Sequence, residues 1–378
     1  MTASPLQRGD FFYTLRPMYV LPLQDISCTN DLLPFTSTRS VLGIRMGILT
    51  LSEKWMLLLG LNGFMLNKNP SAPSLPANIL PTRALAARIR EEANRELFHP
   101  AGQGPFNQAA IDRIITHGRL IRYPWHIFQH NAEALLEDFE LITTGRESQP
   151  IPPSVRAINP EAIFIEAGAN VQHCVLNAST GPIYIGPKAE IMEGSLVRGP
   201  FAACEGATVK MGAKIYGATT LGPYSTGGGE IKNTVFFGYS NKGHDGYLGD
   251  AVIGEWCNLG AGTSASNLKN NAGTIRVWHP ASGSYLDAGQ KCGLLMGDYS
   301  RTAINTSFDS GTLTGVCCNI FGAGVPPKYI PDFSWGHNGS VRYEWDKAIR
   351  DIASWKKMKN QIFTDSQVLR LKHIFESL

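Results

Sequence analysis

The sequence predicts a solenoid of short strands over residues 151–330, between a small α/β domain (1–150) and an extended segment with C-terminal helices (331–378). An apolar residue returns at every sixth position: Ile185, Ile191, Val197, Ala203, Val209, Ile215 and Leu221. Four residues after each comes a second register, in which six of seven residues are small: Ala189, Ser195, Phe201, Ala207, Ala213, Thr219 and Ser225. A period of six fits neither an α-helix nor a long alternating strand, but it fits short strands that turn a corner every six residues.

The repeat continues on both sides of this run, with one interruption. Ile165 and Val171 keep the spacing before it, and Ile253 and Leu259 resume it afterwards. The pattern is absent for about thirty residues after Leu221. We therefore expect the segment from Thr226 to Asp250 to be a loop that projects from the solenoid, where functional residues tend to gather.

The first 150 residues have a different sequence pattern, in which strand and helix signals alternate. The apolar runs predict strands at 18–23 and 76–80, and the periodic segments predict helices at 40–60, 82–97, 106–118 and 131–145. This alternation indicates a small α/β domain. A Pro-rich segment at 148–160 reads as the linker into the solenoid.

The end of the chain predicts an extended segment and then two helices. The extended segment is 321–336, and amphipathic patterns at 343–360 and 364–378 predict helices, the second with Thr364 or Asp365 as its cap. We expect a terminal helix to close the end of the solenoid and cover its open strand edge.

Composition narrows the class of protein. The 34 basic and 31 acidic residues are too balanced to indicate nucleic-acid binding. The seven cysteines are odd in number and form no C-x-x-C pair, so we expect small buried side chains in a reducing compartment rather than disulfides or a metal site. The most apolar stretch, 55–66, is too short to span a bilayer, and the start lacks a signal-peptide core. These features predict a cytoplasmic protein with no membrane partner.

The interruption of the repeat holds the candidate chemistry. His244 lies there between glycines and acids, with Lys232, Lys242 and Tyr247 nearby. Histidine is the side chain best suited to accept a proton near neutral pH. The next repeat adds Asn258, Asn267 and Lys269, whose polar groups could order a substrate or a pantetheine arm. A histidine in a Gly-rich loop is also compatible with an ordinary solvated residue.

The segment GHDGYLGDAVIGEWCNLGAGTSASNLKNN resembles the acetyltransferase half of bifunctional N-acetylglucosamine-1-phosphate uridyltransferase/glucosamine-1-phosphate acetyltransferase. Residues 15–340 are similar to bacterial sugar nucleotidyltransferase-like proteins, through segments such as GPIYIGPKAEIMEGSLVRGPF, KMGAKIYGATTLGP and PDFSWG. The resemblance implies a left-handed parallel β-helix of hexapeptide repeats, preceded by a small α/β nucleotidyltransferase-like domain and followed by a helical tail. It also implies a homotrimer.

The resemblance further implies roles for residues. His244 matches the general base, and Lys232, Tyr247 and Asn258 match residues that hold an amino sugar phosphate. Lys210 lies near a position where the family has a phosphate-binding Arg, although Lys lacks the bidentate grip of Arg.

The same resemblance implies acetyl-CoA or another acyl-CoA as the second substrate. Asn267 and Lys269 are the candidate residues for its binding, with Arg276 as a further candidate for its diphosphate. Gly273 lies near a position where the family has a functional Lys, which is a departure from its pattern.

The N-terminal domain departs further from the family. Sugar nucleotidyltransferases have a Gly-rich loop after the first strand, but here no glycine lies between Met18 and Val41. Without such a loop the backbone cannot cradle a triphosphate in the usual way. We therefore predict an acyltransferase with a degenerate N-terminal domain. The alternatives are a sugar-1-phosphate nucleotidyltransferase that uses Mg²⁺, or a trimeric scaffold that has lost its chemistry.

Overall fold

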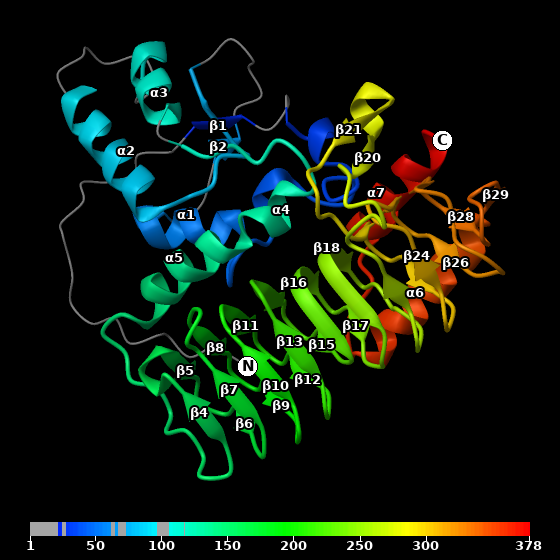
Figure 1. The fold of residues 1–378 in the computed structure, drawn as a ribbon. Coiled ribbons are helices and arrows are strands. Elements are labelled where there is room, and N and C mark those ends of the chain that lie inside the picture. Colours follow the sequence, from blue (N-terminus) through cyan, green and yellow to red (C-terminus); the bar gives the residue numbers. More distant parts are fainter. Residues whose placement is uncertain (1–21, 25–27, 62–64, 67–72, 97–105, 117) are drawn as a thin grey trace.

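A computed structural model describes residues 22–24, 28–61, 65–66, 73–96, 106–116 and 118–378 of the chain. A parallel β-helix forms the body of the molecule, an α/β layer lies against one side of it, and two helices end the chain (Figure 1). The predicted fold class, a β-helix between a small α/β domain and a helical tail, is confirmed.

The β-helix is a three-sided prism, and we number its faces in the order in which the chain crosses them. Face 1 contains β4 (Arg156–Ile158), β7 (Val175–Asn177), β10 (Leu196–Arg198), β13 (Lys214–Tyr216), the first halves of β16 (Glu230–Gly238) and β18 (Tyr247–Glu255), β19 (Ser264–Ala265) and β24 (Ser307–Phe308). Face 2 contains β5 (Ile163–Ile165), β8 (Ile183–Ile185), β11 (Phe201–Ala203), β14 (Thr219–Leu221), the second halves of β16 and β18, β22 (Leu295–Met296), β25 (Leu313–Thr314) and β27 (Tyr329–Ile330). Face 3 contains β6 (Asn170–Val171), β9 (Glu190–Ile191), β12 (Thr208–Val209), β15 (Thr226–Gly227), β17 (Asn241–Lys242), β23 (Arg301–Thr302), β26 (Asn319–Ile320) and β28 (Ser334–Trp335).

The repeat of six places one side chain of each short strand inside the prism. The seven apolar residues from Ile185 to Leu221 are at most 2% exposed and belong to one hydrophobic core. Parallel pairing keeps them in register from coil to coil, as in Val197 opposite Ile215. The small residues of the second register are buried too, so the predicted solenoid period is confirmed over this run.

The predicted loop at 226–250 is wrong. This segment contains β15, β16, β17 and the start of β18, and it continues the β-helix. The period of six fails because β16 and β18 each run around the corner between faces 1 and 2 without a separate turn. Asn233 and Asp250 stand at those corners with φ of 46° and 47°, a left-handed conformation that Asn and Asp tolerate better than most residues. Each coil is therefore shorter, and the inward positions lose their regular spacing.

One further segment leaves the regular coils. The antiparallel hairpin of β20 (Arg276–His279) and β21 (Ser284–Asp287), with a short 3-10 helix (Pro280–Ser282) between its strands, is inserted between β19 and β22. His279 lies against the N-terminal layer, where its Nε2 is 3.3 Å from the carbonyl oxygen of Asp31.

The N-terminal layer has a small parallel sheet and several helices. The sheet contains β1 (Pro22–Gln24), β2 (Met65–Leu66) and β3 (Leu75–Pro76). The helices are α1 (Leu51–Leu59), α2 (Arg83–Glu96), α3 (Gln108–Ile115), α4 (His126–Gln129) and α5 (Asn131–Thr143). The helices predicted at 82–97, 106–118 and 131–145 are confirmed by α2, α3 and α5. Of the strand predicted at 18–23, residues 18–21 lie outside the described residues.

The helix predicted at 40–60 is correct only in its second half. It begins at Leu51 behind a capping box of Thr50 and Glu53, and it ends at Gly60, whose φ is 68°. The preceding residues form a short 3-10 helix and a tight turn instead. Gly47 in that turn has φ of +77°, and a Cβ there would lie 2.7 Å from the carbonyl oxygen of Ala134.

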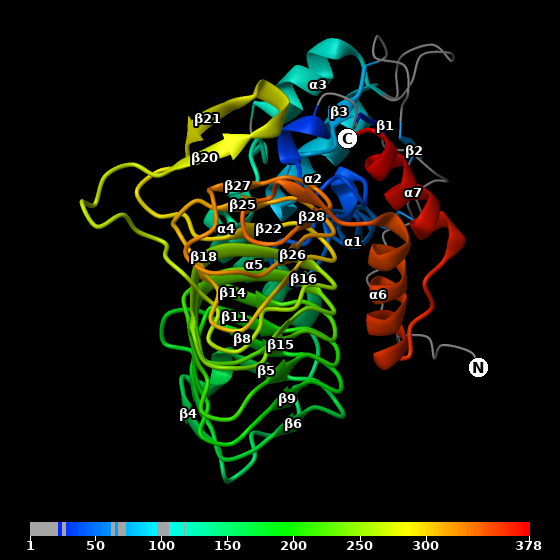
Figure 2. The same ribbon diagram turned by 90° about the vertical axis from the view of Figure 1, so that its right-hand side faces the viewer.

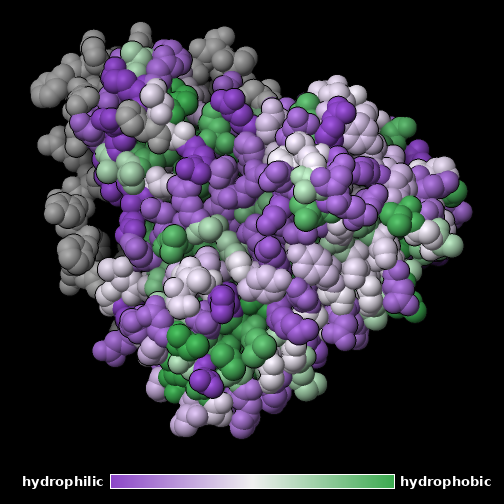
Figure 3. Space-filling view, viewed as in Figure 1, coloured by the Kyte–Doolittle hydropathy of each residue, from purple (hydrophilic) through white to green (hydrophobic). Residues whose placement is uncertain are grey.

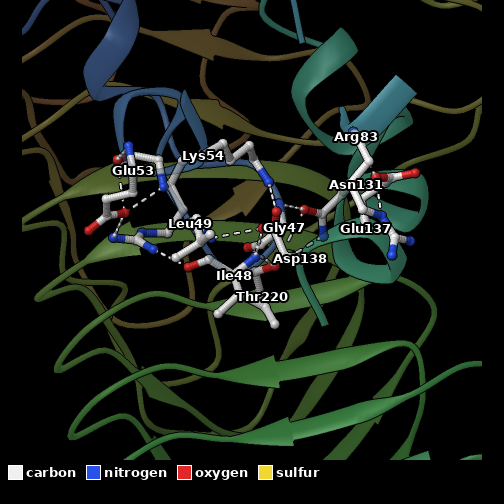
Figure 4. A network of polar contacts seen from close by, with 12 residues as sticks. Gly47, Ile48, Leu49, Glu53, Lys54, Arg83, Asn131, Glu137, Asp138 and Thr220 are labelled. Atoms are coloured by element: carbon white, nitrogen blue, oxygen red, sulfur yellow. Dashed lines mark hydrogen bonds and ion pairs between the residues drawn. The ribbon is translucent and has the colours of Figure 1, made fainter. Parts of the chain in front are cut away.

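Face 2 and the N-terminal layer share one hydrophobic core. Trp55 and Phe35 of the layer belong to the same cluster as Val235, Phe237 and Val252, which face outward from the β-helix. A buried polar network lies beside that core (Figure 4). In it, Lys54 is paired with Asp138. The layer is therefore joined to the β-helix by apolar packing and by buried hydrogen bonds.

The same network ties a tight turn of the layer to the β-helix. The amide of Gly47 donates to Asn131 Oδ1 at 2.7 Å. The Asn131 amide in turn donates to the carbonyl oxygen of Ala218 at 2.7 Å, and the Thr220 hydroxyl donates to the Gly47 carbonyl oxygen at 2.9 Å.

The C-terminal helices α6 (Trp345–Met358) and α7 (Asp365–Glu376) run along the side of the molecule (Figure 2). The expectation that a helix closes the end of the solenoid is therefore wrong. An apolar cluster holds α6 against the corner between faces 2 and 3, where Trp256, Tyr299 and Phe333 meet Ala348 and Ile352. Bulky side chains repeat along this corner. Packing against them favours a helix that runs along the corner over one that lies across the end of the prism.

The burial of the cysteines agrees with the sequence analysis. All seven cysteines, Cys28, Cys174, Cys204, Cys257, Cys292, Cys317 and Cys318, are buried, as predicted. Burial raises the pKa of the Cys174 thiol to about 11, which disfavours the reactive thiolate. None of the helices in the described ranges is long and apolar enough to cross a membrane.

Candidate functional site

His244 lies on a corner turn between two faces of the prism. The turn Gly243–Gly246 joins β17 of face 3 to β18 of face 1, and the imidazole is exposed. Faces 1 and 3 carry no helix in the described part of the chain, apart from the edge of face 3 that runs along α6 (Figure 2). The turn is therefore open to solvent, on the side of the prism away from the N-terminal layer.

A shallow pocket of about 200 Å³ adjoins this turn. Its lining comes from three successive coils and contains Gly212, Lys214, Gly229, Glu230, Asp245, Gly246 and Tyr247. Gly229 is required there, because a Cβ at this position would lie 2.9 Å from the carbonyl oxygens of His244 and Gly246. The pocket thus presents one ammonium, two carboxylates and a phenol next to the turn that carries His244.

The outward side chains of face 1 form a polar row next to the pocket. The Tyr216 hydroxyl donates to Glu230 Oε1 at 2.7 Å, and this hydrogen bond raises the pKa of Tyr216 to about 12. Lys232 stands two residues further along β16, with its ammonium 6.0 Å from the centre of the Tyr216 ring. Tyr247 follows on the adjacent strand, opposite Glu230. Lys232 and Tyr247, both predicted site residues, therefore share face 1.

Tyr247 is held in place by its surroundings. Burial of the phenol and the nearby charge of Asp250 raise its pKa to about 12, so the hydroxyl keeps its proton at neutral pH. Its hydroxyl lies over Gly249, where any side chain would collide with it. Tyr247 can therefore donate or accept a hydrogen bond at a fixed position on face 1.

Asn267 has a structural partner. Asp250 stands at the corner between faces 1 and 2, and its two carboxylate oxygens accept from Asn233 at 2.6 Å and from Asn267 at 2.5 Å. This ladder of side chains joins three successive corners. The amide that the sequence assigns to cofactor binding is thus engaged in holding the coils together.

The other predicted site residues lie apart from face 1. Asn258 is on face 3, in the bridge between Asn241 and Arg301. Lys210 is on the same corner as His244 but two coils away, since Val209 pairs with Gly227 and Gly227 with Lys242.

The loop residues after β19 are separate again. Lys269 donates to the carbonyl oxygen of Thr274 at 2.5 Å, and Gly273 lies in the same loop. Arg276 is on β20 and donates to the carbonyl oxygen of Tyr285 at 3.0 Å. Within one chain, Tyr247 and Lys232 therefore share face 1, Asn267 hydrogen-bonds to Tyr247 from the next coil, and His244 lies on the turn before Tyr247. The remaining candidates lie elsewhere.

Two pocket residues, Lys214 and Glu230, were missed in the sequence. Both stand at outward positions of face 1, next to the inward Ile215 and Ile231. The period of six identifies the inward position, and the residue before it on a strand must point outward. That alternation was the available signal, although it cannot tell an ordinary surface charge from a site residue. No cluster of three or more His, Cys, Asp or Glu side chains suited to a metal occurs among the residues that the structure describes.

The N-terminal layer matches a known protein family. Residues 23–68 and 77–147 match the family described as Sugar nucleotidyl transferase. The N-terminal layer resembles that family. The match covers less than a third of the chain, and it falls on the layer that packs against face 2.

Two curated relatives match this chain over shorter stretches than the family does. The bifunctional protein GlmU of Methanocaldococcus jannaschii is 32% identical over 91 residues, which are 24% of this chain and 22% of that protein. The bifunctional sugar-1-phosphate nucleotidylyltransferase/acetyltransferase of Sulfurisphaera tokodaii is 33% identical over 97 residues, 25% of this chain and 24% of that protein. The chain thus aligns with about a quarter or less of the length of these relatives.

A solved UDP-N-acetylglucosamine acyltransferase from Campylobacter jejuni aligns over 59% of this chain and 95% of that chain. Its TM-score is 0.24 and its identity is 14%, a likeness too slight to carry an inference. The resemblance to sugar nucleotidyltransferase-like and bifunctional acetyltransferase proteins is supported by the family match and the curated relatives.

Proposed function

We propose that the protein is an acyltransferase that acts on an amino sugar phosphate or a sugar nucleotide, with His244 as the general base. The observation that carries this proposal is the exposed His244 on a turn whose next two residues, Asp245 and Gly246, line a pocket of about 200 Å³. The similarity to bifunctional nucleotidylyltransferase/acetyltransferase proteins supports the same class of reaction.

The residues of face 1 suit the parts of such a substrate. The ammonium groups of Lys214 and Lys232 suit a sugar phosphate, and the Tyr247 hydroxyl suits a sugar hydroxyl. In the reaction, a His244 ring nitrogen accepts a proton from the substrate amine while the amine nitrogen attacks the carbonyl carbon of an acyl-CoA thioester. The C–S bond then breaks, and the CoA thiolate leaves and takes up a proton.

Assembly would complete the site. Faces 1 and 3 meet each other at the corner that carries His244. Face 1 also has exposed apolar side chains, such as Ile158, which is 42% exposed, and Leu196, which is 51% exposed. Figure 3 shows this hydrophobic patch over the lower coils, around β7 and β10 of Figure 1. We propose a homotrimer in which these open faces meet, so that Asn258 of one subunit approaches Tyr247 of the next. Light scattering should then give about three times 41.2 kDa.

Three cations in the described part of the N-terminal layer count against the nucleotidyltransferase alternative. Arg39 is paired with Asp298, Arg45 Nε donates to the Phe237 carbonyl oxygen at 3.1 Å, and Lys54 is paired with Asp138. All three therefore already have partners inside the molecule. A triphosphate needs free cations and backbone N–H groups, so we propose that the layer supports the β-helix and does not transfer nucleotides.

The test is acyl transfer by the full chain with a panel of CoA thioesters and of amino sugar phosphates and sugar nucleotides. His244→Ala should lower kcat by about 10² to 10⁴-fold, the usual contribution of a positioned base. Its melting temperature should stay close to that of the wild type, since the side chain is exposed. His244→Gln keeps a hydrogen-bonding group without the base, so it should be as slow as His244→Ala.

His173 provides a matched control, because it also stands on a corner turn between faces 3 and 1, several coils away. His173→Ala should leave the rate unchanged. If His244→Ala transfers acyl groups as fast as the wild type, the proposed role of His244 is wrong. If no thioester supports transfer but pyrophosphate is released from UTP or dTTP with Mg²⁺, the nucleotidyltransferase alternative is correct.

A further inference from the structure

Lys242 occupies a position where the β-helix otherwise places apolar or small residues. It is the inward residue of β17 and is 1% exposed. In the coils before it the same position is Val209 and then Gly227, and in the next coil it is Leu259. A lysine with its ammonium inside a prism is costly to bury, so its presence calls for a compensating interaction.

The compensating interaction is a set of three hydrogen bonds to the corner turn. Lys242 Nζ donates to the carbonyl oxygens of Gly228 at 3.0 Å, His244 at 3.0 Å and Gly246 at 2.7 Å. An ammonium has three N–H donors, and each of these carbonyls can take one of them. Two of the carbonyls belong to the turn that carries the imidazole, and the third belongs to the coil before it.

These contacts hold the His244 turn from the inside. The turn itself is glycine-rich, with Gly243 and Gly246 on either side of the exposed residues, so its own backbone has many accessible conformations. Apart from Lys242, the described contacts give the His244 and Gly246 carbonyls one other partner, the Glu230 amide at 3.2 Å from the Gly246 oxygen. The ammonium thus fixes the direction of two peptide groups that flank the base.

We infer that Lys242 is a positioning residue, which fixes the turn 243–246 and thereby the place of the His244 imidazole. That Lys242 fixes the turn is inferred from the three hydrogen bonds alone. That the turn positions a catalytic base rests on the proposed function. Lys242 has no route to the substrate itself, because its ammonium is inside the prism. Its effect on the reaction must therefore pass through the turn.

The first test measures the turn without any activity assay. Lys242→Met fills the same space and removes the donors, and Leu259→Met changes the neighbouring inward position on the same face without touching the turn. Hydrogen exchange followed by mass spectrometry should show amide exchange at 243–247 faster by about tenfold or more in Lys242→Met, the effect of about one lost hydrogen bond. Leu259→Met should exchange like the wild type there. Equal exchange in all three proteins would overturn the inference.

The second test separates positioning from binding and from proton transfer. Lys242→Met should lower kcat by about 10 to 100-fold with an unchanged KM for the acyl donor, because a base displaced by about 1 Å loses rate rather than affinity. The limb of the pH–rate profile that His244→Ala removes should persist in Lys242→Met. Lys242→Arg, which keeps donors, should recover part of the rate. Loss of that limb in Lys242→Met would make Lys242 a proton carrier and refute the positioning role.

The two tests fail independently. If the wild type transfers no acyl group, the proposed function is wrong, and the exchange experiment still decides whether Lys242 holds the turn. If Lys242→Met does not fold, Lys242→Gln takes its place. Its shorter amide cannot reach all three carbonyls, so the same rise in exchange at 243–247 is expected, and normal exchange would refute the inference.

Discussion

The buried ammonium of Lys242 makes the stability of the protein depend on pH in a way that one substitution removes. Burial lowers the pKa of Lys242 from its ordinary value of 10.5 to about 8, and the nearby charge of Asp245 offsets only part of this. Lys242→Met places an unbranched side chain that is only one atom shorter at this position, and it has no titrating group. The pH dependence of the difference in unfolding free energy between the two proteins therefore reports the protonation of Lys242 alone.

The sign follows from where the proton is bound. Below about pH 8 both the folded and the unfolded wild type hold the proton, so the difference between the proteins is constant. Between about pH 8 and 10.5 the folded lysine has lost its proton and the unfolded one keeps it, so wild-type stability rises with pH relative to Lys242→Met. Each pH unit contributes at most about 1.4 kcal/mol, which gives about 3 kcal/mol over the whole window.

Urea unfolding of both proteins between about pH 7 and 10.5, at equal concentration and with a reducing agent, measures this difference. Buried tyrosines, the cysteines and Lys359 also titrate in or near this range, but they are present in both proteins and their effects cancel. A difference that stays flat across the window would refute the reasoning, because it would mean that the Lys242 ammonium is as well solvated in the fold as in the unfolded chain.

Two further substitutions and one deletion test other parts of the structure. Lys54→Met should lower the unfolding free energy in urea by about 3 to 5 kcal/mol, because it leaves Asp138 buried without its partner. Deletion of 1–150 should give protein that aggregates on a sizing column, since it uncovers the apolar side chains of face 2; a soluble, well-folded fragment would show that the shared core is dispensable. Gly249→Ala should displace the Tyr247 ring and raise the KM of the sugar substrate with little change in melting temperature; an unchanged KM would exclude Tyr247 from substrate binding.

The regular part of the fold could be predicted because one rule governs many residues. Each inward residue from Ile185 to Leu221 sits in an equivalent environment, so the spacing alone carries the architecture. Helices with complete local signals were also predictable, as in α7, where Thr364 caps the helix and Gln367 completes the capping box. The packing of the N-terminal layer on face 2 was not predictable. Outward residues such as Phe237 look like strand residues of any kind until their partner layer is known.

The candidate site could be predicted only where it coincided with a motif. His244 and Tyr247 are three residues apart in the sequence, on the turn before β18 and at the start of β18. Asn267 looked equally suitable as a ligand, yet its amide holds Asp250 at a corner. A polar residue in a repeat protein has the same appearance whether it binds a substrate or joins coils, because both roles require an outward side chain and a hydrogen bond.

The break in the repeat and the candidate site coincide for a physical reason. A regular coil places an apolar or small residue at its inward positions, and such a residue cannot donate hydrogen bonds to a corner turn from the inside. In the shortened coil of β17 the inward position passes to Lys242, whose ammonium reaches the carbonyls on both sides of the imidazole. A solvent-exposed turn with two glycines is thereby fixed without covering its outer surface, which leaves His244 free to meet a substrate. The period of six fails at the corners between faces 1 and 2, and Lys242 holds the turn of the coil that lies between β16 and β18. Similar internal lysines beneath Gly-rich corners would indicate such turns in other β-helices.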